Sequence, residues 1–488
     1  MSFNITQYFF EVCDKYPNRI AIIHENKHIT YKQLEIEVKN TIAYFESKGI
    51  KNGDRILVFV GMSIDLYRIL LATFAMGAVA IFLDEWVSLK RLNVCIKMAG
   101  CKAIIAPSKL RTIGLFVEEI RKIDVFLDPK KQLLSTTYTI EETQYTSSAL
   151  ITFTTGSTGK PKAVDRTHTF LNEQFKVLKP LLIGEVRLTL LPVVLLLNLG
   201  LGVTSVIVKT KKFKAKNCLQ LVDRLKIDSI IASPFYLLEL SKYVKGDLLN
   251  LKQIISGGAP IFGTEINKIT SKFNTDFTIV YGSTEAEPIS HFHANEVVEQ
   301  KGNRGLFVGK IDPSIKLKIV PTENILPSIT TNELNKKELK CGEIGEIIVN
   351  GITVNENYID NPEAVKQNKI ITEKEIWHRT GDSGYIDENN FLYLMGRVSQ
   401  IIHHKEKIYY PFEVENALKN IPGIENGTLL KLKNKLILII STSGEINKHN
   451  LDTFDYDELI FLKNIPVDAR HKTKIDYIKL SKMIENKI

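Results

Sequence analysis

One stretch of the 488-residue sequence decides the fold: Ile151-Thr152-Phe153-Thr154-Thr155-Gly156-Ser157-Thr158-Gly159-Lys160-Pro161-Lys162-Ala163-Val164. The apolar and β-branched residues at its start predict a buried strand. The strand is followed by a loop of small hydroxylated residues and two glycines, in which unhindered backbone N–H groups, hydroxyls and lysines can surround a polyphosphate. Gly156 and Gly159 permit close approach and positive φ angles, and Lys160 and Lys162 supply point charges.

The spacing of this loop excludes a Walker A motif, which places four residues between its glycines and follows the lysine with Ser or Thr. Here two residues separate the glycines, and Pro161 follows Lys160. A proline disfavours helical backbone in the residue before it. We therefore expect the loop to continue in extended form toward Val164 and to close over a triphosphate, the alternative being a surface hairpin.

The composition predicts a globular protein rather than a nucleic-acid-binding one. The chain is 44% hydrophobic and 24% charged, with a net charge of +9. Its lysines are scattered, without a zinc-finger spacing or a basic stripe flanked by aromatic residues, so we expect no nucleic-acid partner. Five scattered cysteines without a C-x-x-C pair favour a reducing compartment, and the N-terminus lacks a signal pattern. The predicted location is cytoplasmic.

The segment from Leu188 to Val208 carries no charged residue and is long enough to span a bilayer. Pro192, Asn198 and two glycines interrupt it. We interpret it as a strand, a turn and a buried helix, and expect no membrane span.

Strands and helices alternate along the first hundred residues. A helix is expected from Ile5 to Lys15, another from Thr30 to Lys48, a strand at 56–60 and a helix from Ile64 to Met76. Such alternation predicts an α/β fold with a doubly wound sheet. The polar segment from Leu326 to Lys340 is expected to be a flexible loop.

The loop at 154–160 resembles the phosphate loop of the adenylate-forming superfamily, which contains acyl-CoA synthetases, peptide-synthetase adenylation domains and firefly-type luciferases. Four further segments resemble signatures of this superfamily and occur in the same order along the chain. They are Ser256-Gly257-Gly258-Ala259-Pro260, Tyr281-Gly282-Ser283-Thr284-Glu285, Arg379-Thr380-Gly381-Asp382 with Gly396-Arg397, and Lys474-Ile475-Asp476.

The resemblance implies a binding site for ATP and Mg²⁺. Thr284, Lys160 and Lys474 would be catalytic, with Lys472 as a rival for the last position; Thr284 would touch the α-phosphate. Glu285 would hold the metal, Asp382 would accept the ribose hydroxyls from a turn, and Arg397 would be a second ribose contact. The full nucleotide-binding set would be Thr154, Thr155, Gly156, Ser157, Thr158, Gly159, Lys160, Gly258, Ala259, Pro260, Tyr281, Gly282, Ser283, Thr284, Asp382 and Arg397.

The same resemblance implies the domain organisation. A large N-terminal body over residues 1–395 would combine layered α/β subdomains with a small β-barrel-like part. A small mobile α+β domain over residues 396–488 would follow a hinge near Gly396 and carry Lys474.

The implied activity is the ATP-dependent activation of a small-molecule carboxylic acid to an acyl-adenylate, followed by transfer to CoA or an acyl carrier protein. The aliphatic run at 191–197 favours a fatty acid over an amino acid. Glu406 stands where the superfamily has a glycine, and the segment Pro466 to Lys474 resembles the β-lactone synthetases of olefin biosynthesis. The alternatives are therefore a β-lactone synthetase acting on an adenylated β-hydroxy fatty acid, or a non-catalytic homologue that binds AMP or acyl groups.

Overall fold

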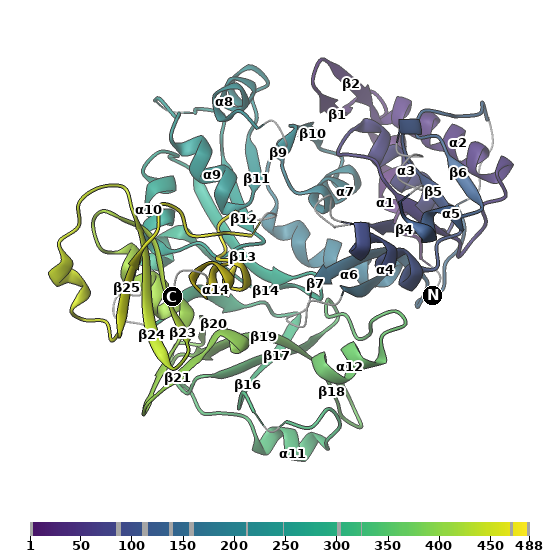
Figure 1. Cartoon of the computed structure of the whole chain (residues 1–488). Helices are drawn as coiled ribbons and strands as arrows, with labels where there is room; N and C mark the ends of the chain where they lie inside the picture. Colours follow the sequence, from purple (N-terminus) through teal and green to yellow (C-terminus); the bar gives the residue numbers. More distant parts are fainter. Residues whose placement is uncertain are drawn as a thin grey trace.

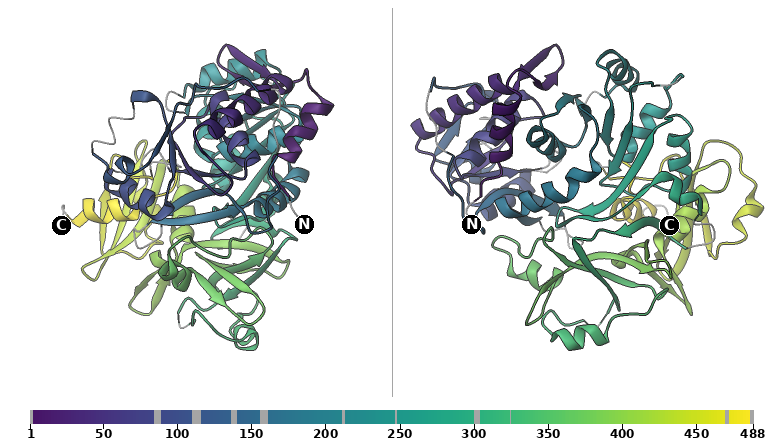
Figure 2. Two further views of the ribbon diagram at one scale, coloured as in Figure 1. Left: turned by 90° about the vertical axis from the view of Figure 1, so that its right-hand side faces the viewer. Right: turned by 180° about the vertical axis from the view of Figure 1, so that it is seen from behind.

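The computed structural model describes residues 3–83, 89–109, 116–135, 140–155, 161–210, 213–246, 248–299, 304–323, 325–468 and 472–485. In these ranges the strands form a six-stranded sheet, a 14-stranded sheet, a three-stranded sheet and a two-stranded hairpin. Figure 1 shows the six-stranded sheet on one side of the molecule and the C-terminal segment on the other, with the 14-stranded sheet between them; Figure 2 shows the same arrangement from two other sides.

The six-stranded sheet has the order β6-β5-β3-β4-β7-β8 and is parallel except for β8. Its strands are β3 (Arg55–Val58), β4 (Val79–Phe82), β5 (Ala103–Ile105), β6 (Val125–Leu127), β7 (Ser148–Thr155) and β8 (Pro161–Thr167). The helices of this region are α1 (Gln7–Lys15), α2 (Tyr31–Ser47), α3 (Ile64–Ala75), α4 (Leu89–Ala99), α5 (Glu118–Arg121) and α6 (His168–Leu178). The predicted helices at the start of the chain are confirmed to within two residues at each end, and β8 confirms the extended backbone after Pro161.

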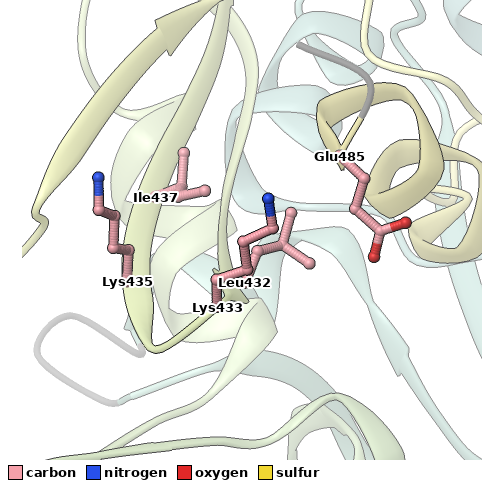
Figure 3. Close-up of a pocket in the computed structure, with 5 residues that line it drawn as sticks. All are labelled: Leu432, Lys433, Lys435, Ile437 and Glu485. Carbon is pink, nitrogen blue, oxygen red and sulfur yellow. The ribbon is translucent and has the colours of Figure 1, made fainter. Parts of the chain in front are cut away.

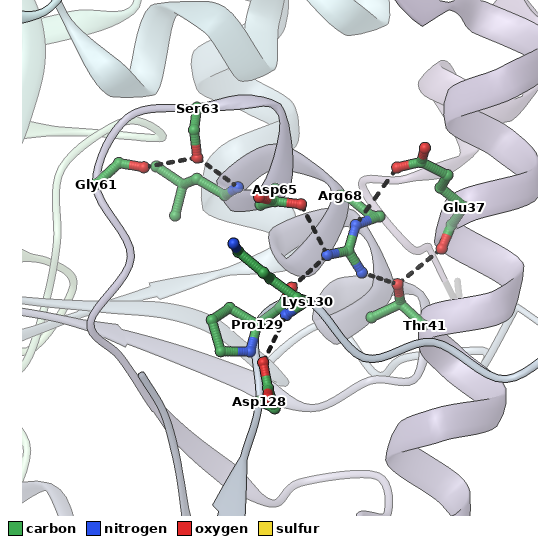
Figure 4. Close-up of polar contacts among 10 residues, drawn as sticks. Glu37, Thr41, Gly61, Ser63, Asp65, Arg68, Asp128, Pro129 and Lys130 are labelled. Atoms are coloured by element: carbon green, nitrogen blue, oxygen red, sulfur yellow. Dashed lines mark hydrogen bonds and ion pairs between the residues drawn. The ribbon is translucent and has the colours of Figure 1, made fainter. Parts of the chain in front are cut away.

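A buried arginine ties the helices of this layer together (Figure 4). Arg68 of α3 is fully buried and donates hydrogen bonds to the Thr41 hydroxyl of α2 and to the Pro129 carbonyl. Its guanidinium also lies 3.0 Å from Asp65 and 3.5 Å from Glu37. Because a buried charge without partners would be costly, these contacts make Arg68 an internal anchor between α2, α3 and the segment after β6.

The 14-stranded sheet has two halves. Along the sheet, the strands from β1 to β13 pair in parallel, and the strands from β14 to β20 pair antiparallel. The order β16-β17-β19-β20-β15-β14-β13-β12-β11-β9-β10-β1-β2 is completed by β18, which pairs with β19. The parallel half contains β1 (Ile20–His24), β9 (Val186–Thr189), β10 (Thr204–Ile207), β11 (Ser229–Ala232), β12 (Gln253–Gly257) and β13 (Asp276–Ser283), with β2 (Lys27–Thr30) antiparallel at its edge. Its helices are α7 (Pro192–Leu201), α8 (Ala215–Arg224), α9 (Pro234–Ser241) and α10 (Gly263–Thr270).

The antiparallel half contains β14 (Ala286–His293), β15 (Leu306–Ile311), β16 (Ile315–Val320), β17 (Gly345–Gly351), β18 (Lys369–Ile371), β19 (Ile376–Ile386) and β20 (Phe391–Arg397). Two short helices, α11 (Thr331–Lys336) and α12 (Pro362–Asn368), lie in its connections. The expectation of a loop over 326–340 is thus wrong for α11. The sequence does contain a signal for the start of α11, the capping box of Thr330 and Glu333. In this motif each side chain accepts a hydrogen bond from the other residue's backbone N–H.

The chain after Gly396 forms β21 (Ile402–His404), β22 (Lys407–Tyr409), α13 (Pro411–Lys419), β23 (Ile424–Leu432), β24 (Lys435–Thr442), β25 (Glu458–Phe461) and α14 (Tyr477–Glu485). The β23-β24-β25 sheet packs on α13 and α14 around small cores of its own. A mixed α/β body followed by a small α+β segment agrees with the predicted fold class.

The uncharged segment from 188 to 208 consists of the end of β9, α7 and β10, as expected. No helix within the described residues is long and apolar enough to cross a membrane. Leu195 and Leu199 of α7 are fully buried in the same core as Phe9 of α1. The aliphatic character of this helix therefore serves core packing on one of its faces.

Candidate active site

The predicted nucleotide-binding segments follow neighbouring parallel strands. Strands β12 and β13 pair in register, with Gly257 opposite Val280, so both segments leave the sheet at the same edge. Such an edge, beyond the carboxyl ends of the strands, is where open α/β sheets bind ligands. Gly258 has a φ of +82°, and a Cβ on Gly282 would lie 2.9 Å from the Ala286 carbonyl oxygen, so both positions require glycine.

An acidic side chain from a distant strand meets this edge. The Tyr281 hydroxyl donates a hydrogen bond of 2.8 Å to Oδ2 of Asp382, and Arg397 Nε lies 3.2 Å from Oδ1. Asp382 raises the pKa of Arg397, whereas burial raises the pKa of Tyr281 well above its ordinary value. The structure thus brings together three residues that the sequence predicts to bind the nucleoside.

Asp382 lies within strand β19 and not in a turn, contrary to expectation. Gly381 has a φ of +71°, and the pairing of β19 with β17 shifts register between Glu346 and Ile348. The pairing of β19 with β20 places Asp382 directly opposite Arg397. A sequence pattern of Gly followed by Asp does not distinguish a strand irregularity from a turn.

Glu285 lies where the two large sheets meet. The Thr154 hydroxyl, at the end of β7, donates to Glu285 Oε1 over 3.1 Å, and the Tyr358 hydroxyl donates to the same oxygen over 3.3 Å. The neighbouring Thr284 carbonyl accepts a hydrogen bond of 3.0 Å from Arg166. Two hydroxyl donors thus hold one oxygen, Oε1, of the buried carboxylate in place.

The residues around Glu285 fit a magnesium ion that is held mainly by phosphate oxygens. Within the described ranges, no group of three or more His, Cys, Asp or Glu side chains could hold a metal ion by itself. Mg²⁺ in nucleotide sites takes only one or two carboxylates, with phosphates and waters as its other ligands. A single fixed carboxylate beside the predicted phosphate loop is therefore a suitable donor set.

Two lysines surround Tyr358: Lys162, which the sequence predicts as a point charge of the phosphate loop, and Lys369, for which it predicts no role. The ammonium groups of Lys162 and Lys369 lie 5.5 and 5.3 Å from the centre of the Tyr358 ring. Lys369 is almost completely buried and donates to the Asn355 carbonyl. Burial lowers the pKa of Lys369 to about 7, and the nearby charge of Glu285 acts in the opposite direction.

A short segment joins the two halves of the site. Residues 353–359, here called the bridging segment, make isolated bridges from Val354 to Ala286 and from Tyr358 to Val164. The Asn355 backbone N–H donates to the Glu285 carbonyl over 2.7 Å, and that of Ile359 donates to the Ala163 carbonyl over 3.0 Å. The bridging segment thus connects β8 with the Thr284–Glu285 turn. It carries no pattern that would reveal this role in the sequence.

Lys474 and its rival Lys472 have different surroundings. Burial lowers the pKa of Lys474, and the positive charge of Arg397 lowers it further, while Asp382 acts in the opposite direction. Lys474 is therefore within electrostatic reach of the Asp382–Arg397 pair. Lys472 instead places its ammonium 4.8 Å from the ring centre of Phe235 in α9.

The central part of the predicted phosphate loop, Gly156 to Lys160, lies outside the described residues, as does the side chain of Thr155. On either side of it, β7 ends at Thr155 and β8 begins at Pro161. In the β21–β22 hairpin, the left-handed residue is Lys405, with a φ of +55°, and not Glu406.

A separate cavity lies on the small C-terminal sheet (Figure 3). It has a volume of about 120 Å³ and is lined by Leu432, Lys433, Lys435, Ile437 and Glu485. None of these residues belongs to the predicted site. Pockets for drug-sized ligands typically measure about 300–1,000 Å³, so this cavity is too small to hold a nucleotide.

A sequence model described as "AMP-binding enzyme" matches residues 9–359. The chain is 24% identical to 4-coumarate-CoA ligase 1 of Narcissus pseudonarcissus over 501 residues, covering 94% of this chain and 88% of the relative. It is also 24% identical to an olefin beta-lactone synthetase of Stenotrophomonas maltophilia over 512 residues, covering 93% and 90%.

The fold is similar to the solved structure of O-succinylbenzoate coenzyme A synthetase from Bacillus subtilis in complex with ATP and magnesium ion. The TM-score is 0.81 and the identity is 21%, with 97% of this chain and 99% of that chain covered. The family match spans well over half of the chain. The chain therefore belongs to the family of AMP-binding enzymes, as an AMP-forming acid–thiol ligase of the acyl-CoA synthetase type.

Proposed function

We propose that this enzyme activates an aliphatic carboxylic acid with ATP, releases pyrophosphate and transfers the acyl group to CoA or to an acyl carrier protein. One observation carries the choice of acid, namely the apolar surroundings at the carboxyl ends of β9 and β11. These strands are neighbours in the parallel half of the large sheet, and β11 also pairs with β12. Their ends therefore lie at the same edge as the predicted nucleotide-binding residues.

The residues at these strand ends are uncharged. After β9 come Leu191, Val193 and Val194, which keep partial solvent exposure, and after β11 comes Phe235, whose ring faces the Lys472 ammonium. Burying an unpaired ammonium against such side chains would be unfavourable, whereas each buried methylene contributes about 0.8 kcal/mol. The two relatives named above are a 4-coumarate-CoA ligase and an olefin beta-lactone synthetase, whose names refer to different compounds. The choice of acid therefore rests on the side chains of this chain.

The proposed chemistry is attack of a carboxylate oxygen on the α-phosphorus of ATP. A new phosphorus–oxygen bond forms, the bond from the α-phosphorus to the oxygen bridging it to the β-phosphorus breaks, and pyrophosphate leaves with that oxygen. Lys474 and Lys160 neutralise the negative charge that develops on the phosphoryl oxygens. Thr284 and the other residues at 154–160 stabilise the same charge by donating hydrogen bonds. Bound Mg²⁺ would add Lewis-acid stabilisation of the phosphates.

The nucleoside is proposed to contact two groups, the carboxylate of Asp382 and the aromatic ring of Tyr281. A carboxylate has about four lone-pair positions, of which Tyr281 and Arg397 occupy two on Asp382. Two positions remain for the ribose hydroxyls. The ring of Tyr281, fixed through its hydroxyl, would stack on the adenine, with Gly258, Ala259 and Pro260 on the neighbouring strand end.

We further propose that residues 1–395 and 396–488 act as two domains with a hinge near Gly396. A Cβ on Gly396 would lie 2.9 Å from Pro411 of α13, and its φ is +117°. A side chain at this position would be strained in the present arrangement. This close contact supports a junction at which the backbone of the two parts must turn.

A second candidate is closure of an adenylated β-hydroxy acid into a β-lactone. Two observations favour it: the similarity to an olefin beta-lactone synthetase over 93% of the chain, and the carboxylate of Glu406 in the β21–β22 turn, where it would repel CoA phosphates.

The experiment that tests both candidates measures pyrophosphate release and product mass. Fatty acids, β-hydroxy fatty acids, amino acids and 4-coumarate are offered with ATP and Mg²⁺, with and without CoA. A thioester supports the ligase, and loss of water from a β-hydroxy acid without attached CoA supports the lactone. An acyl-AMP that persists indicates a carrier protein as the acceptor. Release with amino acids or 4-coumarate alone would overturn the aliphatic proposal, and no release with any acid would overturn the activity.

A further inference from the structure

A hydrogen-bonded tyrosine lies immediately after the segment that carries Lys474. Tyr477 is the first residue of α14, and its hydroxyl donates to Glu415 Oε1 over 2.6 Å. The same hydroxyl shares a hydrogen bond of 2.7 Å with the Thr428 hydroxyl. Glu415 belongs to α13 and is buried, so Tyr477 satisfies an acidic group that water does not reach.

The backbone between Tyr477 and Lys474 leaves little freedom to the lysine. The Lys474 carbonyl accepts a hydrogen bond of 2.9 Å from the Asp468 N–H, and the Asp476 N–H donates to the Pro466 carbonyl over 2.9 Å. The intervening Ile475 is buried in the core beneath α14. Any force that holds Tyr477 therefore also holds the backbone of Lys474, three residues away.

Helix α13 is itself docked on the large body. Arg304 forms two hydrogen bonds, of 2.5 and 2.9 Å, to the carboxylate of Glu413. At the other end of the helix, Lys419 lies 2.9 Å from Glu265 of α10, and both side chains are 12% exposed. Glu415 lies between these two contacts on the same helix. It therefore connects the body, through α13 and Tyr477, with the segment of Lys474.

The charges that face Lys474 also include Glu415. Arg397, at the end of β20, disfavours the charged form of the lysine, whereas Asp382, Asp468 and Glu415 favour it. Glu415 is the one among these that contacts Tyr477. It thus influences both the position of the ammonium group and its charge.

We propose that Tyr477 and Glu415 are positioning residues for Lys474, which hold its ammonium group at the Asp382–Arg397 side of the site during adenylation. This inference rests on the proposed role of Lys474. It predicts that loss of the Tyr477 hydroxyl lowers the rate of adenylation without changing the affinity for ATP, because neither residue contacts the predicted nucleotide site.

The test compares Tyr477→Phe with Tyr409→Phe by pyrophosphate release. Tyr409 is a matched control, because its hydroxyl also donates to a carboxylate, Asp455, in the same C-terminal segment, over 2.9 Å. We expect kcat to fall about tenfold or more for Tyr477→Phe with KM for ATP unchanged, and to stay within about twofold for Tyr409→Phe. Glu415→Gln keeps an acceptor oxygen and should retain more activity than Glu415→Leu.

A double-mutant cycle separates positioning from general structure. In a Lys474→Ala background, Tyr477→Phe should change the rate by less than about twofold, because the group that it positions is absent. Equal effects in both backgrounds, or a Tyr477→Phe enzyme as active as Tyr409→Phe, would overturn the inference. If Tyr477→Phe does not fold, Thr428→Val provides the same comparison. A Lys474→Ala enzyme with full activity would instead overturn the proposed role of Lys474.

Discussion

The hydroxyl of Tyr281 donates a hydrogen bond to Asp382 across 2.8 Å, although 101 positions separate the two residues in the sequence. Strand β13 supplies the tyrosine from the parallel half of the large sheet, and β19 supplies the aspartate from the antiparallel half. This hydrogen bond therefore fixes the position of β19 relative to β13 at the point where the nucleoside is proposed to bind.

Asp382→Ala should weaken the binding of ATP and AMP. A hydrogen bond to a charged group contributes about 1.5–3 kcal/mol, and the substitution also leaves Arg397 without the carboxylate 3.2 Å away. Isothermal titration calorimetry with AMP measures the loss. Tyr281→Phe is the control for the indirect part of the effect, since it removes only the neutral donor. An unchanged affinity in Asp382→Ala would exclude a ribose contact.

Lys474→Ala should reduce pyrophosphate release by orders of magnitude, because the charge that neutralises the reacting phosphate is lost. AMP affinity and the melting temperature should change little, since Lys474 is not part of a hydrophobic core. Lys472→Ala is the matched control and should be nearly as active as the unaltered enzyme. The reverse order of activities would move the catalytic assignment to Lys472.

Glu285→Gln should increase the Mg²⁺ concentration needed for half-maximal pyrophosphate release by about tenfold or more, because an amide oxygen is a weaker ligand than a carboxylate. Tyr358→Phe removes one hydrogen bond to Glu285 but leaves its charge. We expect the tyrosine variant to shift the Mg²⁺ dependence only slightly. Identical Mg²⁺ curves for Glu285→Gln and the unaltered enzyme would contradict a metal-binding role.

The stability of the protein should depend on Lys369 above pH 7. Burial lowers the pKa of Lys369 to about 7 in the folded protein, whereas the ordinary value is 10.5. Between these values the unfolded chain binds the proton that the folded protein has lost, so unfolding becomes less favourable as the pH rises, by at most about 1.4 kcal/mol per pH unit. Lys369→Met lacks this contribution. Denaturant unfolding of both proteins at pH 7 and pH 9 should show a gain in stability for the unaltered protein only.

The sequence was sufficient to predict local features whose cause lies in neighbouring residues. Pro161 favours extended backbone after the loop, which is observed as β8. In the segment 188–208, Pro192 begins α7 and Gly202 caps its end, which separates the helix from the two strands. Thr330 and Glu333 carried a capping signal that reveals α11, although the polarity of the surrounding segment suggested a loop.

Contacts between distant segments could not be predicted in the same way. Nothing near Lys369 in the sequence indicates that it is buried beside Tyr358, and nothing near Asp382 distinguishes an irregular strand from a turn. The buried face of α7 shows the same limit, because its aliphatic residues suit both a core and a ligand pocket. The packing of Leu195 with Phe9 assigns part of that helix to the core.

The distribution of the site along the chain has a consequence for protein synthesis. Thr154 meets Glu285, the bridging segment joins the Glu285 turn to β8, and Lys474, which is within electrostatic reach of Asp382, follows Thr154 by 320 positions in the sequence (474 − 154). A ribosome makes the first of these residues long before the last. Nascent chains therefore cannot assemble the complete site, and a polypeptide that is still being made would hold the nucleotide-facing edge without the lysine that the reaction is proposed to need.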